Sequence, residues 1–138
     1  MPYPNDKKSV VVNQVSDVEA EIEISGEIGF GWFTDGVTKE DISAEIKQIA
    51  NLKASVVNIN LVGSLGGDVN EGLSISDLLG QMNAKRNVKI HGLIASISTA
   101  ISSVGDFIEI SDNSLYLIHH AMTGAGGNVF EIQQTVED

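Results

Sequence analysis

Three residue sets that could do chemistry follow three successive apolar segments of the chain. Ser96 comes shortly after a mostly apolar segment at residues 88–93, and His119 closes another at residues 115–119. The glycine-rich stretch GSLGGDVNEG, residues 63–72, follows a third at residues 55–62. A serine hydroxyl becomes a nucleophile when an imidazole takes its proton, and paired glycines can aim backbone N–H groups at an oxyanion. These residue types make Ser96 a candidate nucleophile, with a histidine as its base and the glycine turn as a candidate oxyanion hole.

Ser96 lies where an apolar strand is predicted to run into a helix rich in small residues. A serine at such a junction can be held on a tight turn, beside the first free N–H groups and the positive dipole end of the helix. The structural alternative is that the serines of this segment only let a helix pack closely. The serines concerned are Ser96, Ser98, Ser102 and Ser103.

The general base could be either of two adjacent histidines, His119 and His120. An imidazole takes up a proton near neutral pH, which suits this role. On a strand the two side chains would point to opposite faces, so only one of them can face Ser96. The alternative for either is a histidine that caps a strand end or faces solvent.

The glycine-rich stretch could bind an anion through its backbone. Gly66 and Gly67 allow the main chain to approach a ligand closely and to present N–H groups to it. A phosphate-binding loop would need a lysine after the glycines, but Asp68 stands there instead. Binding through backbone N–H groups, as in an oxyanion hole, therefore remains the expectation.

The amino-acid composition further limits the reactions and partners that this protein could have. The chain has 138 residues, enough for one domain with its own core, and no cysteine, which excludes a thiolate nucleophile, a disulfide and a cysteine-ligated metal. Its net charge is −11 and its last basic residue is Lys89. Because nucleic-acid binding depends on clustered lysine and arginine, no nucleic-acid partner is expected. With no nucleotide motif either, we expect neither a cofactor nor a metal.

The chain carries no sign of a targeting or membrane segment. Its first ten residues lack the apolar core of a secretory signal. The longest weakly polar run, residues 88–104, is interrupted by Lys89 and His91 and is too short to cross a bilayer. We therefore expect an intracellular protein, in the cytoplasm, with no membrane partner.

Strand and helix patterns alternate along the chain, which predicts an α/β fold with a mostly parallel sheet. Residues 1–18 are expected to be a tail or arm that orders only against a neighbour. Thr38 with Asp41, and later Asn128 with Glu131, are typical of helix starts. The remaining segments are strands at 20–24, 55–62, 88–93, 107–110 and 115–119, and a helix at 70–82.

The order of these motifs resembles the Clp protease proteolytic subunit family of serine peptidases. The likeness covers about residues 20–138 and rests on Gly66-Gly67 before a helix, on GLIAS at residues 92–96, on Gly-Asp ending ten residues after the serine, and on NSLYLIHH at residues 113–120. Within that family the pattern looks closest to the Clp-like head maturation proteases of phages and prophages. The fold implied is the Clp protease/crotonase-like fold, with repeated β-α units.

The resemblance assigns roles to particular residues. It implies that Ser96 is the nucleophile, that His119 is the base, and that the N–H groups of Gly66 or Gly67 and of Ile97 form the oxyanion hole. The segment over residues 123–128 would begin the family's handle, whose extended part could pair with a substrate strand. Its residues singled out for this role are Thr123, Gly124, Gly126 and Gly127.

The resemblance also implies partners. It indicates a polypeptide substrate and a homo-oligomer, most simply a heptameric ring, single or double. An AAA+ unfoldase and phage capsid proteins are the candidate partners, and the bacterial cytoplasm or the phage prohead is the implied location.

Other functions stay open beside this one. In a non-catalytic, ring-forming scaffold, the serine, histidine and glycine residues would only pack and would not catalyse a reaction. A Ser-Lys peptidase would need a lysine near Ser96, and none follows Lys89. A crotonase-type enzyme acting on coenzyme A thioesters would share the fold.

Two departures from the family pattern qualify these expectations. Leu65 stands where the family has a proline, which removes a stiffening element from the glycine turn. The acidic third member of the family's triad lies further along than Asp138, so we expect residues 19–138 to be a domain that ends inside the handle helix. Without that acid, turnover should fall by orders of magnitude.

Overall fold

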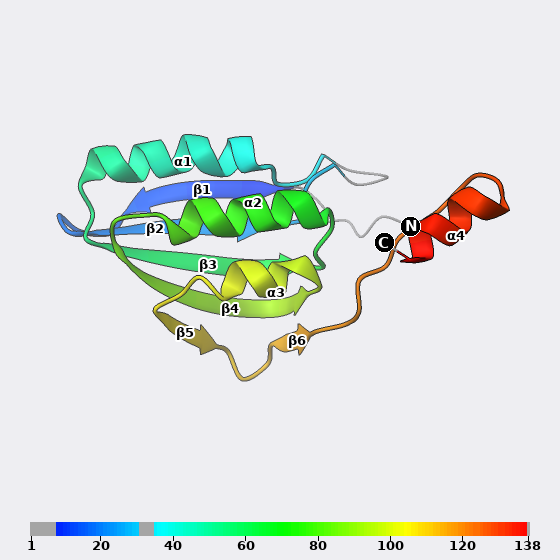
Figure 1. Cartoon of the computed structure of the whole chain (residues 1–138). Helices are drawn as coiled ribbons and strands as arrows, with labels where there is room; N and C mark the ends of the chain where they lie inside the picture. The colour runs from blue at the N-terminus through cyan, green and yellow to red at the C-terminus, as the bar shows by residue number, and fades with distance from the viewer. Residues whose placement is uncertain (1–7, 31–34, 138) are drawn as a thin grey trace.

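The computed structural model describes residues 8–30 and 35–137, which form a mixed α/β structure (Figure 1). Its six-stranded sheet has the order β1-β2-β3-β4-β5, and β6 also pairs with β4. Among the named strands of the described residues, β1 pairs antiparallel with β2 and the other pairs are parallel. The prediction of an α/β fold with a mostly parallel sheet is confirmed. The strands are β1 (Ser9–Gln14), β2 (Glu19–Ser25), β3 (Val56–Ser64), β4 (Lys85–Ala95), β5 (Phe107–Ile110) and β6 (Leu115–Leu117).

Three of the four helices in the described residues connect consecutive strands and lie on the same face of the sheet (Figure 1). These are α1 (Lys39–Leu52), α2 (Val69–Gly80) and α3 (Ile97–Ser102). The fourth, α4 (Val129–Glu137), stands apart from the sheet at the end of an extended segment, and no residue of it is buried. None of the described helices is long and apolar enough to cross a membrane.

The predicted helix starts are both present, because each is made by local hydrogen bonds. The Thr38 hydroxyl accepts from the Asp41 N–H, and the Asp41 carboxylate accepts from the Thr38 N–H. Burial alone would raise the pKa of Asp41, but the bonds from Thr38 and the nearby Lys8 ammonium outweigh it, so this pKa lies below its ordinary value. Asn128 and Glu131 form the same reciprocal pair at the start of α4.

The core lies between the sheet and the three covering helices. Alternate residues of β2 and β3, such as Ile22 and Ile59, point into it, and the helices supply Ile42, Ile75 and Ile101. The strand predicted over 55–62 is present as β3. Its continuous apolar pattern predicts cover on both faces, whereas the three connecting helices lie on one face of the sheet. Burial of apolar surface is the dominant favourable contribution to folding. This core therefore fixes the positions of the parallel strands β3 and β4, whose carboxyl ends lie at the same edge of the sheet.

Two expectations about segments need correction. Residues 9–14 do not form an arm that needs a neighbour: they are β1, which pairs with β2 from Ser9↔Ser25 to Gln14↔Ala20. Residues 1–7 lie outside the described residues. The strand expected over 115–119 ends at Leu117, so His119 and His120 lie beyond it and strand alternation does not orient their side chains.

Candidate active site

Ser96 lies on a strained junction between β4 and α3. Its backbone has φ 57° and ψ −131°, a conformation that residues with a Cβ rarely adopt. The backbone bonds on both sides hold it there: the Ser96 N–H donates to Leu117 O at 3.1 Å, and Ser96 O accepts from the Thr99 N–H at 3.0 Å. The half-buried hydroxyl makes no hydrogen bond with any described residue. A serine held on such an elbow has its oxygen free for attack.

The glycine turn after β3 lies directly against this serine. Gly66 has φ 89°, and a Cβ added to it would be 2.6 Å from Ser96 Cβ and 3.1 Å from Ile97 N. Only a residue without a side chain permits this approach. On its other side the turn is bonded to Ile28, which donates to Gly66 O and accepts from the Asp68 N–H, both at 2.9 Å. The predicted proximity of Gly66, Ser96 and Ile97 is therefore present.

The N–H groups expected to form an oxyanion hole are unengaged. Among the described residues, those of Gly66, Gly67 and Ile97 have no hydrogen-bond acceptor. Ile97 is the first residue of α3, where helix geometry leaves the N–H free. Gly67 (φ 150°) packs against the Ile28 backbone rather than against Ser96, so Gly66 is the glycine nearer the nucleophile.

Ile97 is held by the neighbouring helix α2. A Cβ added to the buried Gly72 would be 2.2 Å from Ile97 Cγ1. The Ile97 side chain thus occupies the space left by a helical glycine, which sets how closely α3 approaches α2.

His119 lies in the segment after β6 and is exposed. Its Nδ1 is 2.6 Å from His120 O. Because a carbonyl only accepts, this bond requires the proton on Nδ1, and in the neutral imidazole Nε2 then carries a lone pair. Among the described residues no hydrogen bond joins His119 to Ser96, so the structure brings the chain near the elbow without pairing the two side chains.

The predicted substrate-binding segment is an exposed stretch without strand structure. Thr123, Gly124, Gly126 and Gly127 are all exposed, and only Gly127 has a positive φ, 138°. A Cβ added to Gly124 or Gly126 would meet nothing within 4 Å. Its pairing with a substrate stays a prediction. Within residues 8–30 and 35–137, no group of three or more His, Asp or Glu side chains could hold a metal ion.

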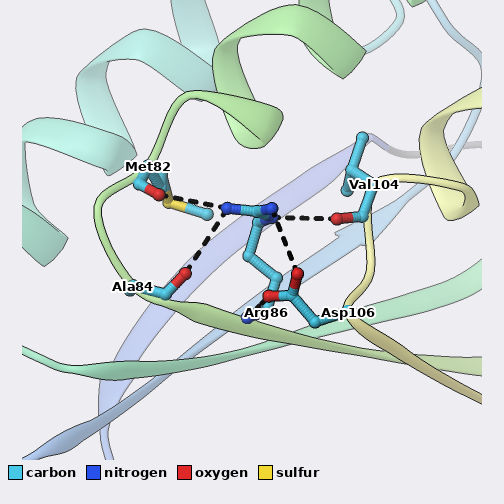
Figure 2. A network of polar contacts seen from close by, with 5 residues as sticks. All are labelled: Met82, Ala84, Arg86, Val104 and Asp106. Atoms are coloured by element: carbon cyan, nitrogen blue, oxygen red, sulfur yellow. Dashed lines mark hydrogen bonds and ion pairs between the residues drawn. The ribbon is translucent and has the colours of Figure 1, made fainter.

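Sequence reasoning missed an arginine that supports the far end of α3 (Figure 2). Arg86, near the start of β4, donates from Nε to Val104 O at 2.8 Å and from Nη1 to Met82 O at 3.1 Å and Ala84 O at 3.4 Å. Its backbone exchanges two 2.8 Å hydrogen bonds with Asp106. This network anchors the segment that follows α3, and it therefore supports the helix whose first residue follows Ser96. The Gly-Asp dipeptide ending at Asp106 was the available sequence signal.

Comparison with known families matches residues 32–138 to Clp protease. Among curated proteins, the ATP-dependent Clp protease proteolytic subunit of Leuconostoc citreum (strain KM20) is 40% identical to this chain over 76 residues. The matched region is 54% of this chain and 36% of that protein, so the chain spans little more than a third of its relative.

Solved structures show the same fold. A ClpP1 mutant from Listeria monocytogenes matches with a TM-score of 0.63 and 22% identity, over 85% of this chain and 64% of that one. The ClpP protease catalytic domain from Plasmodium falciparum matches with a TM-score of 0.57 and 21% identity, over 88% and 61%. A probable enoyl-CoA hydratase from Mycobacterium thermoresistibile reaches 0.57 at 15% identity, over 79% and 52%. The fold is thus common to peptidases and crotonase-like enzymes.

Proposed function

Because the chain belongs to the Clp protease family, we propose that it is a serine endopeptidase that hydrolyses peptide bonds through an acyl-enzyme on Ser96. The observation that carries the proposal is the contact between the strained Ser96 elbow and the Gly66 turn, with the unengaged N–H of Ile97 beside them. A nucleophile and oxyanion donors that converge on one point are what acyl transfer requires.

In the proposed reaction, Ser96 Oγ attacks the scissile carbonyl carbon while His119 Nε2 takes the hydroxyl proton. The carbonyl oxygen becomes negatively charged and is stabilised by the N–H groups of Ile97 and of Gly66 or Gly67. The imidazolium then gives its proton to the departing amine, which leaves an ester on Ser96. A water molecule, deprotonated by the same nitrogen, hydrolyses that ester.

This mechanism requires His119 to move. Its Nε2 must come within about 3 Å of Ser96 Oγ, a contact that often tightens only when substrate binds. The position of His119 favours such a movement, because the residue is exposed and lies beyond the end of β6, where strand pairing does not hold it. In its present position the Nδ1 bond to His120 O places the proton on Nδ1, and the reaction needs the same tautomer after the movement.

The proposal extends to assembly and setting. A homo-oligomeric ring, heptameric, single or double, acting on polypeptides in the bacterial cytoplasm or a phage prohead, fits the family and the exposed apolar surface of α4. That surface comprises Val129, Phe130, Ile132 and Val136. Phage head maturation is the proposed role, with capsid proteins or an AAA+ unfoldase as partners. Sedimentation velocity of the purified chain tests the assembly.

A fluorophosphonate probe tests the chemistry, because it forms a covalent bond only with an activated serine. We expect the unaltered chain to be labelled and Ser96→Ala to be unlabelled. Ser103→Ala is the matched control: it removes an exposed hydroxyl of the same segment, which bonds only to Ala100 O. Its labelling should equal that of the unaltered chain.

The opposite result would favour a non-catalytic scaffold. If the folded, unaltered chain is not labelled, or if Ser96→Ala is labelled as strongly as the unaltered chain, the endopeptidase proposal is wrong. The crotonase alternative predicts no labelling at Ser96 either, but it predicts binding of a coenzyme A thioester, which calorimetry would detect.

A further inference from the structure

A buried pair of serine hydroxyls joins the glycine turn to the nucleophile helix. Ser64, the last residue of β3, and Ser98, in the first turn of α3, have their Oγ atoms 2.6 Å apart. Ser64 is 3% exposed and Ser98 is 1% exposed. We propose that this pair positions the oxyanion hole by holding the Gly66 turn against Ser96 and Ile97. The inference rests on the proposed function, because it concerns the reactivity of Ser96.

The backbone of the turn is bonded to Ile28 on one side, and the Ser64–Ser98 bond is its side-chain link to α3 on the other. Gly63, Gly66 and Gly67 all have positive φ values, and the β3–β4 register shifts between Val62 and Ser64. Leu65 is 60% exposed, so its side chain anchors nothing in the core. Glycine has more conformational freedom than any other residue, so with three of them in five positions the place of the turn depends on the hydrogen bonds and contacts around it. Ser64 is the residue of this turn whose side chain is fully buried.

The contacts around the turn restrict its motion in opposite directions. Toward α3, Gly66 already touches Ser96 and Ile97, so the turn cannot move closer. On the side away from α3, two backbone hydrogen bonds at 2.9 Å hold the turn to Ile28. On the α3 side, the Ser64–Ser98 bond is the side-chain hydrogen bond that opposes movement of the turn away from the helix. The bond therefore sets the separation between the two groups of N–H donors.

Ser98 lies at the start of α3, so its bond to Ser64 acts close to the Ile97 N–H group on that helix. It is two residues after Ser96 and one after Ile97, so movement of its side chain is transmitted directly to the helix start. Ser102, equally buried on the same helix, bonds instead to the Tyr116 hydroxyl at 2.8 Å and to Thr99 O. Ser98 is thus the α3 hydroxyl that bonds to the glycine turn.

The stability and the reactivity of single and double serine variants distinguish a positioning role of this pair from a purely structural one. Replacing one serine by alanine leaves the other hydroxyl buried without a partner, which destabilises the fold. Replacing both removes the unpaired group, and such double replacements can be nearly neutral for stability. They do not restore the link between turn and helix. Stability and reactivity should therefore respond differently in the double variant.

The experiment measures the second-order rate of fluorophosphonate labelling and the urea midpoint of unfolding for Ser64→Ala, Ser98→Ala and the double variant. We expect both single variants to lose stability and to react roughly 10- to 100-fold more slowly, since small displacements of oxyanion donors have large effects on rate. The double variant should regain much of the lost stability but remain about as slow as the single variants.

Ser76→Ala is the matched control, because the half-buried Ser76 hydroxyl bonds only within its own helix, to Gly72 O at 2.9 Å. It should react at the rate of the unaltered chain. If the double variant regains both stability and reactivity, or if the single variants react at the unaltered rate, the positioning role is refuted while the proposed function stands. An unlabelled, folded, unaltered chain refutes both.

Discussion

Replacing Gly66 by alanine should separate the oxyanion donors from the nucleophile while leaving the rest of the fold in place. The new Cβ would lie 2.6 Å from Ser96 Cβ and 2.9 Å from Ala95 O. Carbon atoms in van der Waals contact lie about 3.5–4.0 Å apart, so the turn must retreat by roughly 1 Å. Neither neighbour is the end of a flexible side chain, so the turn is the part that moves.

The size of the effect follows from that displacement. A misplacement of about 1 Å commonly lowers a rate about 100-fold, which is about 2.7 kcal/mol of barrier. The φ of 89° at this position adds a cost in stability, about 1–2 kcal/mol for a residue with a Cβ. We therefore expect Gly66→Ala to be less stable and, while still folded, to react with a fluorophosphonate about 100-fold more slowly.

The assay is the time course of labelling at a temperature where circular dichroism shows the variant folded. Gly80→Ala is the control: Gly80 ends α2, its φ is not positive, and a Cβ added there would meet nothing within 4 Å. Gly80→Ala should label at the unaltered rate and be equally stable or up to about 1 kcal/mol more stable. Labelling of Gly66→Ala within about twofold of the unaltered chain, a change well below the 100-fold expected from a 1 Å displacement, would refute the reasoning.

Three further outcomes can be checked by urea unfolding. Arg86→Met should lower the free energy of unfolding by about 2–3 kcal/mol, because Val104 O and Met82 O lose their donor; an unchanged midpoint would contradict this. Thr38→Ala should lower it by about 1 kcal/mol through loss of the α1 cap. Because folding lowers the Asp41 pKa, its contribution is present above the unfolded-state pKa and disappears as pH falls through the folded-state value. Asp41→Asn should therefore be less stable than the unaltered chain at pH 7, with the difference shrinking in acid.

Local chemistry in the sequence was enough to predict much of the fold. The helix starts at Thr38 and Asn128 need only residues three positions apart, and their capping bonds are present. The strand β3 was recognisable because β-branched and aliphatic residues predominate in it. The junction at Ser96 was likewise predicted, since a strand pattern changes there to a helix of small residues.

Pairing between strands that are distant in the sequence was harder to predict from the sequence alone. The first strand, β1, was expected to be an arm, because its partner β2 defines it and an edge strand has only a weak pattern of its own. β5 and β6 were identified as separate strands, but their pairing with successive parts of the same strand, β4, comes from the turn between them.

The sequence by itself determined which residues could do the chemistry: a serine at a strand–helix junction, a glycine turn and a histidine expected to close a strand. Only the tertiary structure decided how they are held. The Ser64–Ser98 bond joins residues 34 positions apart, and Arg86 bonds to carbonyls on two other segments. Such contacts depend on how the sheet and helices pack in three dimensions, and residue types and spacing alone do not specify that packing.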